Sequence, residues 1–161
     1  MAESVNFSLL QATDSEIRDL IRACQSVKKE AYCVYSEFRV GAALLTEHDR
    51  HIITGCNVEN ASYGLTVCAE RSAICSAVSR GYRKFPVIAV TSDVATRFCT
   101  PCGACRQFIA EFSPSGQVLL VKPGYQEEEY MTGTGIQIIS VANLLPLGFT
   151  PNDLILAKST L

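Results

Sequence analysis

The chain has 161 residues, 48% of them hydrophobic, and we expect residues 1–161 to form a single domain with a sizeable core. The formal net charge is −2, and no basic run is longer than the Lys28–Lys29 pair, so a nucleic-acid partner is not expected. The N-terminus lacks the regions of a secretory signal, and no apolar run approaches the ~18 residues that span a bilayer. We therefore expect a cytoplasmic protein without a membrane partner.

Helices and strands alternate along the chain. A first amphipathic helix is expected up to Val27, with Asp14 or Ser15 as its N-cap. The other predicted helices are 68–78, 102–112, a short one before Pro146 and a last turn after Thr150. The predicted strands are 38–45 and 51–58, which form a hairpin, then 85–93, 118–121 and one that starts at Ile136.

The alternation of strands and helices predicts an α/β domain whose sheet is covered on both faces. The polar, turn-rich segment 122–135 is expected to be an exposed loop or an irregular hairpin.

Eight cysteines are many for this length, but a reducing cytosol disfavours disulfides. Four of them stand beside apolar residues and are expected to pack as small hydrophobic side chains: Cys24, Cys33, Cys56 and Cys75. Cys99 is ambiguous, because it lies close to the next motif.

Cys102 and Cys105 lie three residues apart at the start of a predicted helix and can bind one ion. Alone, this spacing fits a redox pair or half of a structural zinc site equally well. Cys68 also opens a helix, and the only histidines, His48 and His51, fall around a predicted turn. Three thiols with one open position are typical of a catalytic zinc site, unless Cys99 supplies a fourth ligand.

Glu70 follows Cys68 by two residues and can reach a water on the metal without being a ligand. A carboxylate there can take a proton from that water and deliver it to a leaving group. A glutamate in the first turn of a helix is more often a favourable partner of the helix dipole. The combination with "PCGAC" favours the catalytic interpretation.

"CAER" followed by "PCGACRQ" resembles the zinc-dependent nucleoside deaminases, whose signature is often written with histidine at the first ligand. Cys68 at that place is similar to the small tetrameric cytidine deaminases. "AYCVYSEFRVGAALL" and "GCNVENASYGLTVCAER" resemble the same family. The resemblance implies a three-layer α/β/α cytidine deaminase-like fold with a central mixed sheet of about five strands, and one Zn²⁺ per chain.

The resemblance also implies the reaction and the residues that perform it. Cytidine and deoxycytidine would be hydrolysed to uridine and deoxyuridine plus ammonia, as zinc-activated water adds to C4 of the base and Glu70 transfers the protons. Cys68, Cys102 and Cys105 would hold the zinc.

The remaining implied site residues contact the nucleoside. The Ala69 amide would bind the pyrimidine carbonyl, and backbone groups around Thr100 would face the exocyclic amine. Asn57 and Glu59 would bind the ribose, while Phe38 and Tyr63 would line the pocket. From the residues alone, "NVEN" is an ordinary polar loop and Phe38 a core strand residue.

The family resemblance further implies a homotetramer with shared active sites, in which Phe149 reaches the pocket of a neighbouring subunit. The segment around 122–136 is longer than the family's usual hairpin, so its effect on assembly stays open.

The charge of the proposed centre predicts a role for Arg71. Zn²⁺ with three thiolates carries a net −1, which opposes the formation of hydroxide, so nearby positive charge is needed. Two helix N-termini and a hydrogen bond from Arg71 to a ligand sulfur would supply it. Gln107 matches a family position of similar role, whereas Arg106 is expected to be a surface cation.

Three other functions remain open at this point. A deaminase of a nucleoside-like antibiotic such as blasticidin shares the metal motifs, although Asn57 and Glu59 favour a ribose. A nucleic-acid editing deaminase is disfavoured by the absence of a basic patch. A binding module with structural zinc has no use for Glu70.

Overall fold

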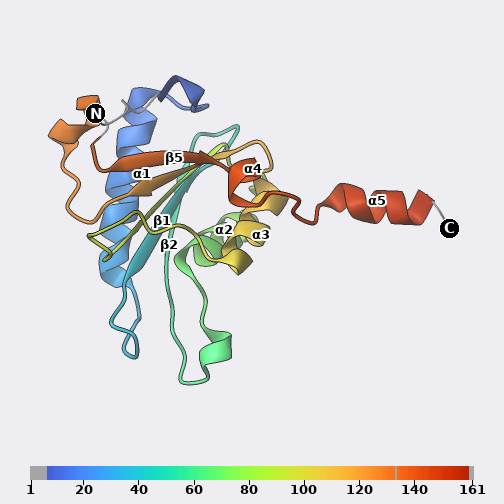
Figure 1. Ribbon diagram of the computed structural model, residues 1–161, viewed down its shortest axis with the longest axis horizontal. Coiled ribbons are helices and arrows are strands. Elements are labelled where there is room, and N and C mark those ends of the chain that lie inside the picture. The colour runs from blue at the N-terminus through green and yellow to red at the C-terminus, as the bar shows by residue number, and fades with distance from the viewer. Residues whose placement is uncertain (1–6, 133, 160–161) are drawn as a thin grey trace.

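The computed structural model describes residues 7–132 and 134–159 and shows a central sheet between helices (Figure 1). The strands are β1 (Val40–Leu45), β2 (Ile52–Cys56), β3 (Val87–Ser92), β4 (Gln117–Val121) and β5 (Ile136–Ser140). The helices are α1 (Asp14–Val27), α2 (Ala69–Ser79), α3 (Gly103–Phe112), α4 (Val141–Leu144) and α5 (Pro151–Ser159). None of the described helices is long and apolar enough to cross a membrane.

The five strands form one mixed sheet in the order β2-β1-β3-β4-β5. β3 and β4 are parallel, and every other neighbouring pair is antiparallel. All six residues of β3 are buried, as expected for a strand covered on both faces. The mixed sheet of about five strands that the family resemblance implies is confirmed.

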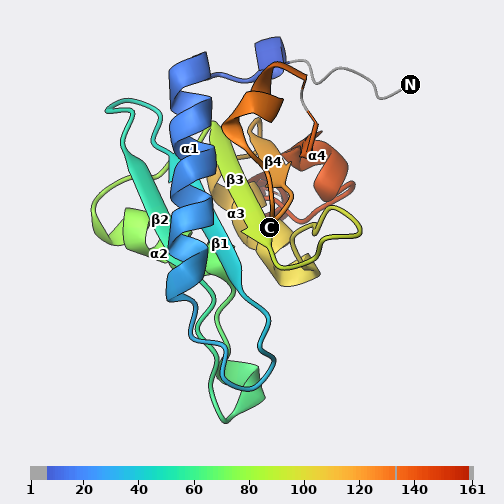
Figure 2. The same ribbon diagram turned by 90° about the vertical axis from the view of Figure 1, so that its left-hand side faces the viewer.

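Alternate residues of the strands pack on opposite faces, which produces three layers (Figure 2). Ala42, Leu44 and Val90 face the layer of α2, α3 and α4, whereas Ala43 and Leu45 face α1. The predicted α/β/α arrangement is therefore also confirmed.

The N-cap predicted for the first helix was wrong by one residue. Thr13 caps α1: its side-chain oxygen accepts from Glu16 N at 3.3 Å, while the Glu16 carboxylate accepts from Thr13 N at 2.7 Å. This reciprocal capping box satisfies two amides, which neither Asp14 nor Ser15 would do.

The predicted hairpin exists, but its strands are shorter than 38–45 and 51–58. Val40 N donates to Asn57 Oδ1 at 2.8 Å, and Asn57 Nδ2 donates to Phe38 O at 2.9 Å. The Asn57 side chain thus takes the place of a strand partner, so regular pairing begins at Val40 and Phe38 lies outside β1.

Two further boundaries differ from expectation. β3 covers six residues rather than 85–93. The expected last turn after Thr150 is the nine-residue α5, which projects away from the sheet (Figure 1).

The segment 122–135, expected to be exposed, packs partly against α1. It contains the 3₁₀ helix η4 (Glu127–Thr132), in which Tyr130 is 2% exposed. Tyr130 OH donates to Asp14 Oδ1 at 3.0 Å, and Arg22 Nη1 lies 2.8 Å from Glu127 Oε2. The tyrosine supplies apolar area that the polar composition of the segment conceals.

Gly55 lets β2 approach α2, and we predict that Gly55→Ala destabilises the protein. An added Cβ would lie 2.8 Å from the Ala69 carbonyl oxygen and closer still to Ala73 N. Overpacking of this kind costs about 1–3 kcal/mol. Thermal unfolding measures the effect, with Gly64→Ala as the control, because a Cβ on Gly64 meets no atom within 4 Å. Equal melting temperatures of the two variants would contradict the prediction.

Candidate metal centre and active site

Three cysteine thiols come together where two helices begin. Cys68 is the N-cap of α2, Cys102 is the N-cap of α3, and Cys105 lies in the first turn of α3. Their sulfurs all lie within 4.8 Å of one another, and those of Cys68 and Cys102 are 3.9 Å apart. Two thiolates on one tetrahedral zinc, each at about 2.3 Å, lie about 3.8 Å apart. The donor set therefore fits zinc.

The described residues supply three thiols to this cluster and no fourth donor from Cys99. All eight cysteines are free thiols. Of the four that were expected to pack, Cys24 is buried but Cys75 is exposed, so the expectation for Cys75 was wrong.

Glu70 lies in the first turn of α2 and is only 4% exposed. Burial raises the pKa of its carboxyl, and the negative charge of the nearby Cys68 acts in the same direction. A buried carboxyl with a raised pKa, next to a cluster of metal-binding thiols, is a candidate for a group that both accepts and releases a proton.

Arg71 faces the cluster from the same turn. Its Nη2 lies 3.6 Å from Cys68 Sγ and donates to Thr66 O at 3.1 Å. Its Nε is buried and has no hydrogen-bond partner among the described residues. A hydrogen bond from Cys105 and then the contact with Arg71 lower the pKa of the Cys68 thiol. The bond to Cys68 and burial raise the pKa of Cys105.

The predicted ribose residues belong to two arms, 31–39 and 57–67, that project beyond the sheet (Figure 2). Glu59 accepts hydrogen bonds from Tyr35 N at 2.9 Å and Ser36 N at 3.2 Å, and also from the Ser36 hydroxyl. The Asn57 side chain bonds to the backbone of Phe38 and of Val40, as described above. Both side chains therefore stabilise the conformation of the arms.

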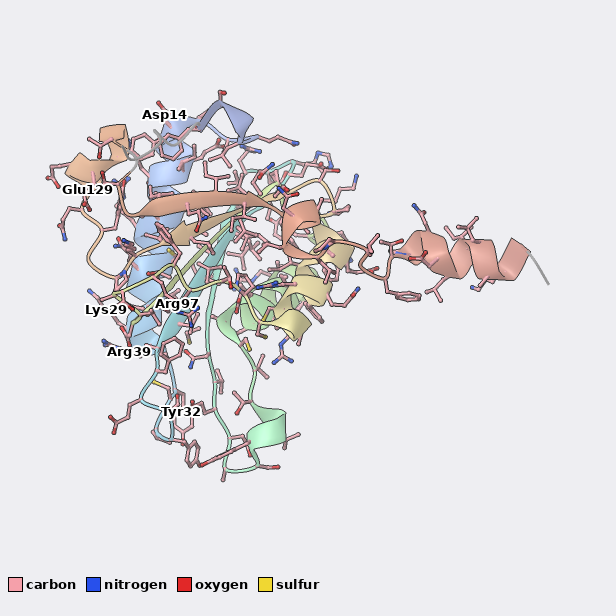
Figure 3. All side chains as sticks on the ribbon, viewed as in Figure 1. Asp14, Lys29, Tyr32, Arg39, Arg97 and Glu129 are labelled. Atoms are coloured by element: carbon pink, nitrogen blue, oxygen red, sulfur yellow. The ribbon has the colours of Figure 1, made fainter. Side chains whose placement is uncertain are left out.

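A hollow of about 210 Å³ lies between the arms. Its lining residues are Tyr35, Ser36, Glu59, Tyr63 and Thr66. Since Thr66 O also accepts from Arg71, the hollow adjoins the thiol cluster. Figure 3 shows Tyr32, which belongs to the arm 31–39.

Two predicted residues lie near the C-terminal tail. Gln107 Nε2 donates to Phe149 O at 2.8 Å, so among the described residues its amide binds the tail and not a sulfur. Phe149 is 58% exposed and precedes the projecting α5. Ala69, by contrast, is completely buried at the head of α2.

Arg106 is not the surface cation that was expected. Its guanidinium donates three hydrogen bonds: Nε to Pro101 O at 2.8 Å, Nη2 to Thr100 Oγ1 at 3.1 Å, and Nη1 to Leu144 O at 3.2 Å. Its partner at 144 is far away in the sequence, and no local pattern announces that contact.

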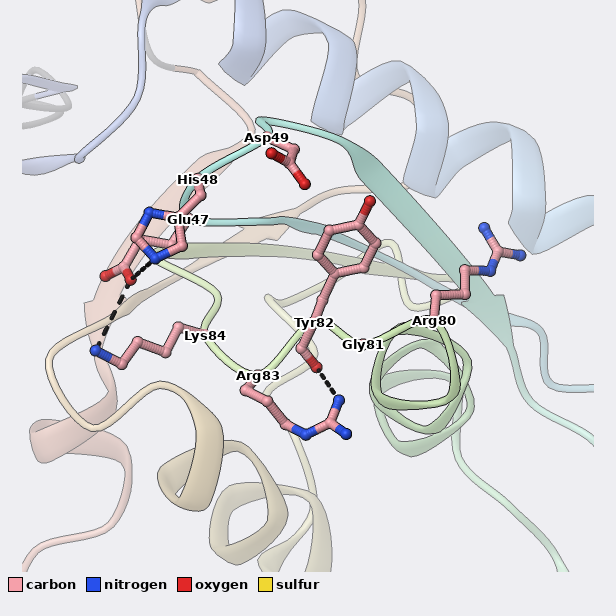
Figure 4. A pocket seen from close by; sticks show the side chains of 8 residues that line it. All are labelled: Glu47, His48, Asp49, Arg80, Gly81, Tyr82, Arg83 and Lys84. Atoms are coloured by element: carbon pink, nitrogen blue, oxygen red, sulfur yellow. Dashed lines mark hydrogen bonds and ion pairs between the residues drawn. The ribbon is translucent and has the colours of Figure 1, made fainter.

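A larger hollow, of about 420 Å³, lies at the other end of α2 (Figure 4). It is lined by Arg80, Tyr82, Lys84 and the turn between β1 and β2, where Glu47 pairs with Lys84 at 3.8 Å. None of the clustered thiols lines it, so volume alone does not locate the chemistry.

Comparison with known proteins identifies the family. A family model described as the cytidine and deoxycytidylate deaminase zinc-binding region matches residues 14–121, which include all three clustered thiols. The chain belongs to this family.

Individual deaminases are similar over most of the chain. The probable cytidine deaminase of Dictyostelium discoideum is 56% identical over 67% of this chain and 72% of that protein. The cytidine deaminase of Sporosarcina psychrophila is 42% identical over 86% and 95%. The crystal structure of the Burkholderia pseudomallei cytidine deaminase superimposes with a TM-score of 0.73 at 40% identity, covering 86% and 100%. The blasticidin-S deaminase of Bacillus cereus is 32% identical over 73% and 81%.

We predict that Arg71→Gln shifts thiol alkylation of this deaminase to higher pH. In zinc-free protein the guanidinium helps to lower the pKa of Cys68 to about 5, so its removal raises that pKa and moves the formation of the reactive thiolate to higher pH. Mass spectrometry of Cys68 alkylation against pH measures the shift. Arg80→Gln, at the other end of α2, is the control. Superimposable profiles for Arg71→Gln and the parent protein would contradict the prediction.

Proposed function

We propose that the chain is a zinc-dependent cytidine deaminase that converts cytidine and deoxycytidine into uridine and deoxyuridine, releasing ammonia. The observation that carries this proposal is the buried carboxyl of Glu70 beside three clustered thiols. A purely structural zinc site has no need for such a carboxyl. The whole chain would act as one domain, with one zinc.

Cys68, Cys102 and Cys105 would hold the zinc and leave its fourth coordination position open for a water. When bound, the zinc would lower the pKa of that water. Glu70 would take a proton from the attacking water and pass it to N3 of the base. A new C4–O bond forms, the C4–N bond breaks, and Glu70 delivers the second proton of the water to the departing amine. The raised pKa of Glu70 suits a group that must both accept and donate.

Backbone and side-chain groups would hold the nucleoside. The Ala69 amide would donate to the pyrimidine carbonyl, and Thr100 O would accept from the exocyclic amine. Thr100 O receives no hydrogen bond from the described part of the chain, which leaves it available.

The ribose would lie in the hollow between the arms, against Glu59 and Tyr63, which line it. Asn57, which donates to Phe38 O, and Phe38 itself would contact the nucleoside from the base of the arms. A carboxylate that accepts from a sugar hydroxyl discriminates against analogues that lack the hydroxyl.

Positive groups would offset the charge of three thiolates. Arg71 is within hydrogen-bond reach of Cys68, and Cys68 and Cys102 lie at helix N-termini. Gln107 would support the zinc centre indirectly, because its amide donates to Phe149 O and so holds the C-terminal tail against α3.

The enzyme would be a homotetramer with active sites shared between subunits. The apolar surface on the arms and tail is what a partner subunit would cover. Its exposed members include Tyr32, Val34, Tyr63, Leu65, Leu147, Phe149 and Ile155. We also propose that the enzyme works in the cytoplasm on free nucleosides and not on nucleic acid, since its net charge is −2 and its sequence has no basic run longer than Lys28–Lys29.

Glu70→Gln should abolish the loss of ultraviolet absorbance that accompanies deamination of cytidine. Removal of a general acid–base group costs roughly 10²- to 10⁴-fold, because no other group moves the protons. Zinc content and oligomer size should stay unchanged, and Glu111→Gln, on the exposed side of α3, is the control.

Blasticidin S is measured alongside cytidine. If only blasticidin S is deaminated, then blasticidin S and not cytidine is the substrate. Zinc without activity on either compound would contradict the catalytic proposal.

Mixed oligomers test the shared active site. Phe149→Ala should be nearly inactive, because the pocket of the neighbour loses an aromatic wall, and Glu70→Gln is inactive by itself. When the two variants are refolded together, some sites combine an intact Glu70 with an intact Phe149 from a partner, and cytidine turnover should return. Each variant refolded alone is the control. Mixtures as inactive as their parts would place Phe149 in its own subunit's site or outside any site.

A further inference from the structure

The loop 93–101 carries the chain from the end of β3 to the zinc-ligand candidate Cys102. Its last two residues are bound by one side chain. Arg106 donates from Nε to Pro101 O at 2.8 Å and from Nη2 to Thr100 Oγ1 at 3.1 Å. Two nitrogens of one planar guanidinium thus bind two adjacent residues of the loop.

The third hydrogen bond anchors the guanidinium to the core. Arg106 Nη1 donates to Leu144 O at 3.2 Å, and Leu144 is buried at the end of α4, in the cluster that includes Ile109 of α3. Because the backbone of Arg106 belongs to α3 and one of its nitrogens binds the end of α4, the side chain has a fixed base from which to hold the loop.

The other end of the loop is also tied down. Asp93 Oδ1 accepts from Lys28 Nζ at 3.0 Å, and Asp93 Oδ2 accepts from Arg39 Nε at 2.9 Å. The loop is thus attached at both ends, and the attachment nearest to Thr100 is Arg106.

We propose that Arg106 is a positioning residue that sets how the enzyme recognises the 4-amino group of the base. The inference rests on the proposed function, in which Thr100 O accepts from that amine. Arg106 binds the hydroxyl of Thr100 and the carbonyl of the next residue, so it fixes the backbone on which Thr100 O is mounted.

Lysine cannot replace arginine in this role. The guanidinium presents five donors in a planar fork, whereas the lysine ammonium is a compact charge on a flexible stem. Arg106→Lys keeps the positive charge but cannot reach Pro101 O, Thr100 Oγ1 and Leu144 O together. A misplacement of about 1 Å at a reacting group can cost about 10²-fold in rate.

The test compares two ligands that differ only at C4. In Arg106→Lys we expect kcat/KM for cytidine to fall roughly 10- to 100-fold. The inhibition constant of the riboside with hydrogen in place of the amine should stay unchanged, because that ligand offers the loop nothing to recognise. Zinc per chain should also be unchanged. Arg83→Lys is the matched control, since Arg83 Nη1 donates to Val78 O at 2.7 Å and Tyr82 O at 3.0 Å, at the far end of α2.

Equal weakening of both ligands, or loss of zinc, would show that Arg106 supports the whole centre and would overturn the inference. If the parent protein releases no ammonia from cytidine, the proposed function itself fails. If the parent protein is active and Arg106→Lys is equally active, only the present inference fails.

A second pair of variants keeps the test decisive if Arg106→Lys does not fold. Thr100→Val removes the hydroxyl that accepts from Arg106 and nearly preserves the shape of the side chain, whereas Thr100→Ser keeps a hydroxyl. Thr100→Val should lose more cytidine turnover than Thr100→Ser, while both bind the amine-free riboside alike. Equal turnover in the two variants would overturn the inference.

Discussion

The concentration of three sulfurs within 4.8 Å is the constraint on which the rest of this structure depends. Thiolates that close repel one another, and zinc leaves them with a net negative charge. The fold answers with the positive ends of two helices and with Arg71, whose Nη2 lies 3.6 Å from a sulfur. The same negative charge adds to burial in raising the pKa of the Glu70 carboxyl. The negative charge of the thiolates thus acts on both the positive groups around the site and the buried carboxyl of Glu70.

The geometry of the sheet makes that concentration possible. A parallel pair of strands needs a crossover connection, and α3 supplies it between β3 and β4. Consequently α3 starts near the carboxyl end of β3, the edge at which open α/β sheets commonly bind ligands. α2 is brought to the same face by its close approach to β2, for which Gly55 leaves room. The two N-termini, each with its cysteine, therefore meet.

The amino-acid sequence predicts the features that depend on local pattern. Periodicity located the helices and strands, and the spacing of Cys102, Cys105, Cys68 and Glu70 indicated zinc chemistry. The sequence pattern could not locate contacts between residues that are far apart in the chain. The sequence around Arg106 predicts a surface cation, since its partner Leu144 is 38 residues away and leaves no local pattern. The polar segment 122–135 hid a tyrosine that packs against α1, and the strand end at Asn57 is set by a side chain that bonds to the opposite strand.

The projecting arms and tail show why one subunit is a poor enclosure for a nucleoside. Small-molecule sites bury roughly 70–90% of their ligand within about 300–1,000 Å³. The hollow beside Glu59 holds about 210 Å³, and its aromatic wall, Tyr63, is itself 73% exposed. Phe149 is exposed as well, on a tail that α3 holds through Gln107. Exposed apolar surface of this kind commonly marks an interaction site, and the proposed homotetramer would cover it with another copy and complete the pocket in the same step.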